Sequence, residues 1–400
     1  GIVLPLFVFG VYLLVLGKYK FLHIFKAIVY AGISSLFLPA LWYIAAWKQG
    51  GDDFLDVVLA ENFGRFFNTS TPEIDYRLGH ENGFFYNFVT LLAGFLPWTI
   101  LFFFSLFGLK VRKPEKTVKE LVTGIWSSIK SMEKVRLFSL VVIVCVIFFY
   151  SFPASKRSVY LMPAYPFIAL FLAQYAIYIT EYKTKATRVF AAFLASCTSL
   201  VLIASALVMG GAINLSTIVA QYTDKASTLY TVSLIQNSLA NPTFLTVFLF
   251  VLLLIALGIL LYQMFRKINI KILYATIGLA FALNLVTDGV FMYTIREGSS
   301  CKAFATRIKK EYPVNRSNVF VVNNLLKYKN MYGLNFYMGN LFHDFEKQLP
   351  EEGYFLVCEK NMPDIEKEYK DQYSFTFLTA TENIPDELDQ KILLYSFTKK

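Results

Sequence analysis

Long apolar stretches alternate with short polar loops over the first 295 residues of this 400-residue chain. A helix needs about 20 mostly apolar residues to cross a hydrocarbon core about 30 Å thick, and its backbone groups must then bond to one another. The pattern therefore predicts an all-α polytopic membrane domain with about eight transmembrane helices, the first and fourth at the short end. The predicted spans are residues 1–17, 26–47, 86–109, 137–152, 160–181, 188–209, 243–265 and 271–295.

The tail, residues 296–400, alternates helical and strand patterns and predicts a small α/β extracytoplasmic domain of about 100 residues. It shows no catalytic constellation, so we interpret it as a cap or acceptor-docking module, with a purely structural lid as the alternative. The expected helices are 301–312, 342–348 and 363–372, and the expected strands are 318–322, 353–359 and 392–398.

The loops between the spans alternate in charge. Those expected in the cytoplasm carry 17 basic and four acidic residues, whereas loop 48–85 carries three basic and seven acidic residues. Lys and Arg concentrate in the cytoplasmic loops of membrane proteins. We therefore expect loops 48–85, 153–159 and 210–242 and the tail to face outward, away from the cytoplasm. The net charge of +10 then reflects topology, and we expect no nucleic-acid partner.

The chain begins Gly-Ile-Val-Leu, already inside an apolar run and without a Met. We therefore expect it to be the carboxy-terminal portion of a longer polytopic protein, with part of the active site upstream. Cys145 and Cys197 lie in apolar spans, where we expect them to pack. Cys301 and Cys358 could pair in an oxidising compartment, although nothing in their spacing places them together. His and Cys residues form no metal-ligand pattern, and we expect neither a metal nor a cofactor.

Loop 48–85 holds the first candidate site residues. Residues 53–67 have apolar side chains at helical spacing and predict an amphipathic helix on the membrane surface. Glu61 and Arg65 share its polar face, either as a surface ion pair or as a pair that holds and orients an anionic head group. His80 and Glu81 stand at the start of the next span, where His80 could be simply hydrogen-bonded.

The short connection at residues 151–166 holds the second group. Lys156 and Arg157 are cations on the side expected to be poor in positive charge. They could reach lipid head groups, or they could clamp a lipid-linked phosphate at the mouth of the helical bundle. Asp288, near the outer end of the last span, is a further ionisable residue in apolar surroundings. In the span from 86 to 109, Pro97 and Trp98 predict a kink and a packing residue.

Three stretches follow one another along the chain: Glu-Asn-Phe-Gly-Arg-Phe at 61–66 with Gly-His-Glu at 79–81, Leu-Pro-Trp at 96–98, and Ser-Lys-Arg-Ser-Val-Tyr-Leu-Met-Pro at 155–163 with Pro166. In this order they resemble GT-C glycosyltransferases that use polyprenyl-phosphate sugars (family 39 type). The resemblance is strongest to the branch containing the lipid A aminoarabinose transferase, which is related to protein O-mannosyltransferases. The tail also resembles the family's small extracytoplasmic domain, where a run like Asn-Phe-Tyr-Met-Gly at 335–339 recurs. The resemblance implies a bacterial inner membrane, with the outward loops and the tail in the periplasm.

The resemblance implies transfer of a sugar from a polyprenyl phosphate to a lipid or protein acceptor, with an acidic base in a loop upstream of residue 1. It implies that Arg65, Lys156 and Arg157 face the donor phosphate, and that Glu61, His80, Glu81 and Tyr160 shape the cavity. A polytopic transporter or flippase for a lipid-linked or anionic substrate is the alternative, and a non-catalytic scaffold is a third. Against transport, the chain has no inverted hydropathy repeat and few charges within its spans.

Overall fold

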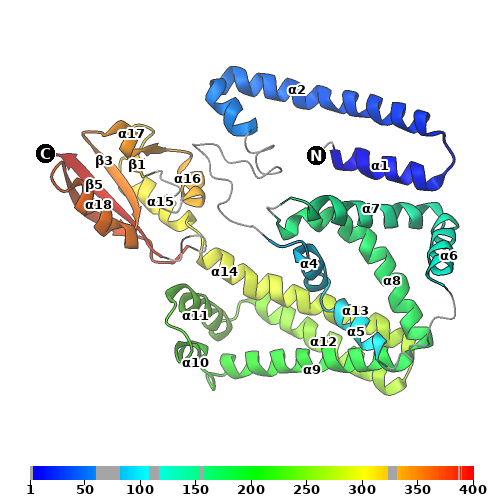
Figure 1. Ribbon diagram of the computed structural model, residues 1–400. Coiled ribbons are helices and arrows are strands. Elements are labelled where there is room, and N and C mark those ends of the chain that lie inside the picture. The colour runs from blue at the N-terminus through cyan, green and yellow to red at the C-terminus, as the bar shows by residue number, and fades with distance from the viewer. Residues whose placement is uncertain are drawn as a thin grey trace. The chain divides into compact units, whose positions relative to one another are not determined.

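The computed structural model describes residues 3–59, 82–107, 117–153, 156–322, 331–385, 388 and 390–400. These residues form two compact units, Gly1–Phe193 with Arg266–Tyr274 and Leu194–Phe265 with Ala275–Lys400. Among the described residues, six helices are long and apolar enough to cross a membrane, and a bent pair makes a seventh. The expected span 1–17 is a shorter apolar helix of 14 residues. The chain is thus a multi-pass helical membrane protein with a small sheet domain at its carboxyl end (Figure 1).

The first unit is helical. One core cluster of this unit forms where α1 and α7 pack together, around Val8, Leu137 and Cys145. Gly51 has φ 73° and ψ −171°, so the long helix α2 is broken before its last turns. The described part of the expected surface helix at 53–67 is thus helical as far as Leu59. The elements are α1 (Val3–Leu16), α2 (Phe21–Leu59), α4 (Tyr86–Gly94), α5 (Trp98–Leu106), α6 (Val118–Lys130), α7 (Lys134–Ser151), the 3-10 helix η2 (Ser158–Ala164), α8 (Tyr165–Tyr182) and the start of α9 (Thr184–Met209).

The expected single span 86–109 is two helices, α4 and α5, bent by 102°. Proline lacks a backbone N–H and its ring obstructs the preceding turn, so α5 starts only after Pro97. Residues around the bend contact α8, with the rings of Phe95 and Tyr165 4.9 Å apart. Lys183, just after the far end of α8, donates from Nζ to the carbonyl oxygen of Ser105 at 2.8 Å. The bent pair therefore follows α8 from one end to the other, as a broken span would. The kink expected at Pro97 is confirmed and is much sharper than an ordinary helix kink.

The second unit contains the rest of α9 and the helices that follow it, except that Arg266–Tyr274, which includes the start of α13, belongs to the first unit. The expected loop 210–242 holds two of them, α10 and α11, which the hydropathy pattern did not indicate. The side chain of Asn214 caps α10 by accepting from the backbone N–H of Thr217. Tyr230 Oη donates to the carbonyl oxygen of Gly298 at 3.0 Å and ties α11 to α14. The elements are α10 (Leu215–Ala220), α11 (Ala226–Ala240), α12 (Phe244–Arg266), α13 (Asn269–Val286), the π-helix η3 (Thr287–Met292) and α14 (Tyr293–Gly298).

The tail forms a mixed five-stranded sheet in the order β2-β1-β3-β5-β4. Strand β1 is parallel to β2 and β3, and β5 is antiparallel to β3 and β4. Side chains alternate between the faces of β3, so Leu356 joins one core cluster and Phe355 the other. The elements are α15 (Lys302–Glu311), β1 (Val319–Val321), α16 (Tyr332–Met338), β2 (Phe342–Asp344), α17 (Phe345–Gln348), β3 (Glu352–Cys358), the 3-10 helix η4 (Glu359–Asn361), α18 (Met362–Tyr369), β4 (Tyr373–Ala380) and β5 (Ile392–Lys399).

Most expected tail elements are confirmed, with one correction and three additions. The segment expected to be a helix at 342–348 begins as strand β2 and becomes helical only at Phe345, where the side chain of Asp344 caps α17. The added elements are α16, β4 and the short η4. The run 335–339 ends α16 at Gly339, which has φ 87°. Cys301 and Cys358 are buried thiols of one core cluster.

Candidate functional site

The connection between α7 and α8, described at residues 152, 153 and 156–164, is held to the start of α4 by buried polar groups. Asn87, on α4, is only 1% exposed. Its Nδ2 donates to the carbonyl oxygen of Tyr150 at 2.8 Å and to Ser151 Oγ at 3.3 Å. Ser151 Oγ in turn donates to the carbonyl oxygen of Ile147. A buried amide with satisfied hydrogen bonds fixes how the two helices meet.

Lys156 is the buried cation of this connection. It is 5% exposed, and its Nζ donates to the carbonyl oxygen of Asn82 at 2.9 Å. Asn82 Nδ2 donates back to the carbonyl oxygen of Lys156 at 3.2 Å. Burying an ammonium is costly unless hydrogen bonds or a counter-charge compensate it. A buried ammonium that has an oxygen partner and further donors is suited to an anionic ligand.

Arg157 and Tyr160 occupy different surroundings. Arg157 is exposed, and its guanidinium forms no hydrogen bond or ion pair with another described residue. The half-buried ring of Tyr160 stacks on Tyr150, with centroids 5.3 Å apart and planes inclined by 22°. The structure therefore places an exposed cation and a fixed aromatic ring within a few residues of the buried ammonium.

The other predicted site residues are placed as follows. Glu61, Arg65, His80 and Glu81 lie outside the described residues. Asn82 follows Glu81 directly, so the carboxyl end of loop 48–85 reaches the Lys156 turn. Asp288 is exposed within the π-helix η3.

Sequence reasoning missed Asn82 and Asn87. The available signal was two amides within six residues at the start of an apolar segment. Polar side chains at such positions commonly hydrogen-bond between membrane helices. Hydropathy alone does not reveal which backbone oxygen each one meets.

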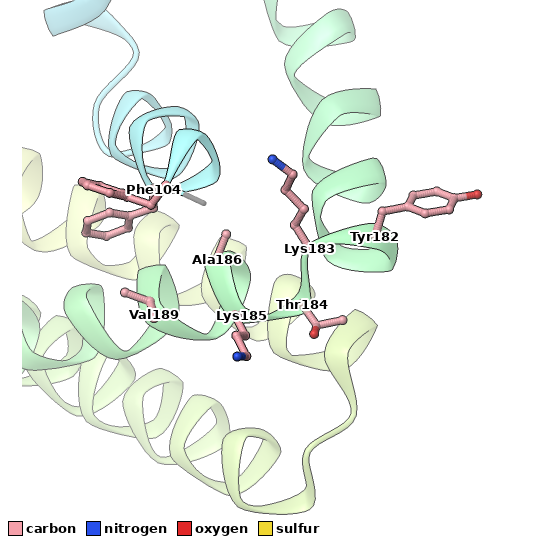
Figure 2. Close-up of a pocket in the computed structure, with 8 residues that line it drawn as sticks. Phe104, Tyr182, Lys183, Thr184, Lys185, Ala186 and Val189 are labelled. Carbon is pink, nitrogen blue, oxygen red and sulfur yellow. The ribbon is translucent and has the colours of Figure 1, made fainter. Parts of the chain in front are cut away.

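A cavity of about 780 Å³ lies at the other end of α5 and α8 (Figure 2). Figure 2 shows the Lys183 side chain extending toward α5, whereas the Lys185 side chain points away from it. The Lys183 ammonium is already engaged by the carbonyl oxygen of Ser105. Because the sequence predicts this end to be cytoplasmic, we place the candidate site at the Lys156 connection. The cavity is lined by Phe104, Phe107, Tyr182, Lys183, Thr184, Lys185, Ala186 and Val189.

Comparison with known proteins gives one structural and one sequence similarity. No protein-family model matches the chain. An uncharacterized protein of Aquifex aeolicus is 29% identical over 176 residues, which are 44% of this chain and 29% of that protein.

ArnT from Cupriavidus metallidurans, solved bound to undecaprenyl phosphate, superposes with a TM-score of 0.59 at 13% identity. The match covers 98% of this chain and 64% of ArnT, so the chain spans less than two thirds of that protein. The chain therefore resembles ArnT in fold over nearly all of its length. This similarity confirms the expected resemblance to the GT-C fold.

Proposed function

We propose that this chain belongs to a membrane glycosyltransferase that moves a sugar from a polyprenyl-phosphate donor to a lipid A-like or protein acceptor on the periplasmic face. Two observations support the proposal. The fold resembles that of ArnT, which was solved with undecaprenyl phosphate. The observation that carries the proposal is a cation, Lys156, buried at the end of the bundle where a lipid-linked phosphate would enter.

In this proposal Lys156 and Arg157 bind the donor phosphate. Lys156 is held in place by Asn82, and Arg157 is exposed. When the sugar is transferred, the bond between its anomeric carbon and the phosphate oxygen breaks, and negative charge grows on that phosphate. Cations already in position stabilise such charge because they need no rearrangement during the reaction.

The remaining residues complete the proposed site. Tyr160 would form part of the cavity wall, because its ring is fixed against Tyr150. The sequence resemblance assigns Arg65 to the phosphate, and Glu61, His80 and Glu81 to the cavity.

The test measures undecaprenyl-phosphate binding by the chain in nanodiscs, with Lys156→Met and Arg157→Gln. Each variant loses a charge-assisted hydrogen bond, for which about 1.5–3 kcal/mol is typical, so we expect affinity to fall about tenfold or more. Lys183→Met is the matched control, because Lys183 also donates to a backbone oxygen, at 2.8 Å, but at the other end of α8.

We expect Lys183→Met to leave the affinity for undecaprenyl phosphate unchanged. If Lys156→Met and Lys183→Met lose the same affinity for undecaprenyl phosphate and the same thermal stability, Lys156 has a packing role and does not bind the phosphate. Incubating the full-length protein with a radiolabelled polyprenyl-phosphate sugar then separates the rival functions. Transfer of the sugar supports the enzyme, whereas movement of the intact donor across the bilayer supports a flippase.

A further inference from the structure

Helix α6 (Val118–Lys130) presents an apolar stripe that, apart from the half-buried Ile129, is exposed among the described residues. Every residue of α6 is exposed or half-buried. Trp126 is 47% exposed and Ile125 61%. At 100° per residue, the apolar side chains fall within less than half of the helix circumference. These side chains are Val118, Leu121, Val122, Ile125, Trp126 and Ile129.

The helix forms for local reasons and does not depend on burial of this stripe. Thr117 and Glu120 make a capping box, in which each side chain bonds the other's backbone N–H. Such a box satisfies two of the amide groups left open at a helix start. A capped helix with one unburied apolar face is typical of a segment that lies on a membrane surface.

The position of α6 relative to a membrane span identifies the surface. Only residues 131–133 separate α6 from α7, a candidate span starting at Lys134. Figure 1 shows α6 running across the direction of α7 and not continuing it. Ile129, at the end of the stripe, packs against the cluster formed by α1 and α7. The stripe is therefore continuous with the membrane-embedded apolar surface.

The charges beside the stripe indicate which lipid it meets. Residues 110–136 carry eight basic and three acidic side chains, a net charge of +5. On the helix, Lys119 and Lys130 border the stripe on the side of Trp126, and the Lys130 ammonium lies 5.3 Å from the centroid of that ring. Long basic side chains at such a border reach lipid phosphates while their stems cover apolar surface. Anionic lipids attract clustered Lys and Arg next to a membrane span.

We propose that α6 is an interfacial helix that binds the anionic phospholipid surface of the leaflet at the start of α7. Its apolar stripe inserts among the acyl chains, and Lys119, Lys130 and Lys134 meet the head groups. The inference does not depend on the proposed glycosyltransferase activity. It assigns the helix a lipid partner and not a protein partner.

The test measures quenching of Trp126 fluorescence by brominated lipid in nanodiscs containing the whole chain. Trp42, Trp47 and Trp98 are replaced by Phe, so that Trp126 reports alone. Discs of brominated phosphatidylcholine are compared with discs in which about 30% of that lipid is replaced by phosphatidylglycerol brominated to the same extent. We expect Trp126 to be quenched in both and more strongly in the anionic discs.

Two variants with the same new residue separate the faces of the helix. Ile125→Asn places an amide in the stripe, and Ser127→Asn places it on the opposite face. Ile125→Asn loses one inserted apolar side chain and should lower the equilibrium constant for insertion of α6 into the bilayer roughly tenfold. Ser127→Asn should leave that constant unchanged. The double variant Lys119→Gln/Lys130→Gln leaves the stripe intact and, because Lys134 remains, should reduce the difference between the two disc types without abolishing it.

Three results would overturn the proposal. One is a Trp126 that lipid bromine does not quench in either disc. Another is equal quenching of the Ile125→Asn and Ser127→Asn proteins. The third is equal quenching by neutral and anionic discs before any charge is removed. Hydrogen exchange of the 118–130 amides checks that each variant keeps the helix. Protection that appears only when a second protein is added would favour a protein partner.

Discussion

The α7–α8 connection and the sheet domain differ in the polar side chains that they bury. Around the connection, Asn87, Ser151 and Lys156 are buried and each is hydrogen-bonded, beside the buried apolar side chains of Leu161 and Ala164. In the sheet domain the largest buried side chains are aromatic, and the ring of Phe345 lies 5.0 Å from that of Phe355. The two regions are therefore specified by different forces.

The difference follows from the solvent around each region. In water, burying apolar surface is the main favourable term in folding, so the sheet domain is organised around its aromatic rings. In lipid, apolar side chains gain little by leaving the surface, and polar contacts and close packing decide which helices meet. On α4, Leu92 is 46% exposed while Asn87 is buried. Hydropathy therefore identifies the spans but not their contacts.

The largest expected loss of stability follows from a substitution in the sheet domain. Phe345→Ala removes a ring at the centre of five aromatic neighbours and should lower the free energy of unfolding by about 3–5 kcal/mol. Urea unfolding of the full chain in micelles, followed by near-ultraviolet circular dichroism, measures the loss. Phe377→Ala is the control, because Phe377 is 54% exposed on β4 and should cost far less. Similar losses in both variants would mean that burial of rings does not organise this domain.

An intermediate effect is expected at the connection. Asn87→Ala removes the amide that bonds the end of α7 and should cost about 1–3 kcal/mol, measured as thermal unfolding in detergent. Asn241→Ala is the control, because its exposed amide donates to the carbonyl oxygen of Asn237, four residues earlier in the chain. If Asn87→Ala leaves stability unchanged, apolar packing alone joins α4 to α7 and the contrast with the sheet domain fails.

The smallest expected effect depends on pH. Burial raises the pKa of Tyr373 above its ordinary value of 10.0, and its Oη has no hydrogen-bond partner among the described residues. The neutral phenol is therefore favoured in the folded state. Its contribution is complete below pH 10.0 and is lost as the pH rises through the folded-state pKa.

Tyr373→Phe removes this titration together with an unbonded buried hydroxyl. We expect it to leave stability at pH 7 unchanged or higher by about 1 kcal/mol, and to reduce the loss of stability between about pH 10 and 12. Unfolding in urea at several pH values measures both effects. Tyr332→Phe, which removes an exposed hydroxyl, is the control. An unchanged alkaline loss in Tyr373→Phe would assign that loss to other groups.

The sequence predicted much of the fold and part of the site. The apolar runs located the spans, and alternation located β3 and β5. Helices α10 and α11 were missed because their segment is neither strongly apolar nor charged. Strand β4 was missed because its residues from Tyr373 to Ala380 alternate only in part, with a register shift between Phe377 and Thr379. Lys156 and Arg157 were singled out because their charge opposed the topological trend.

The sequence by itself determined that this is a multi-pass membrane protein with a small α/β tail, because the length of an apolar run and the period of a pattern are local properties. The tertiary structure decided that Lys156 is buried against Asn82 while Arg157 stays exposed. It also decided that the bend expected at Pro97 is as sharp as 102° and that both halves of the bent pair lie along α8. These outcomes depend on which backbone oxygens come within hydrogen-bond reach when distant segments pack, and no local pattern encodes that distance.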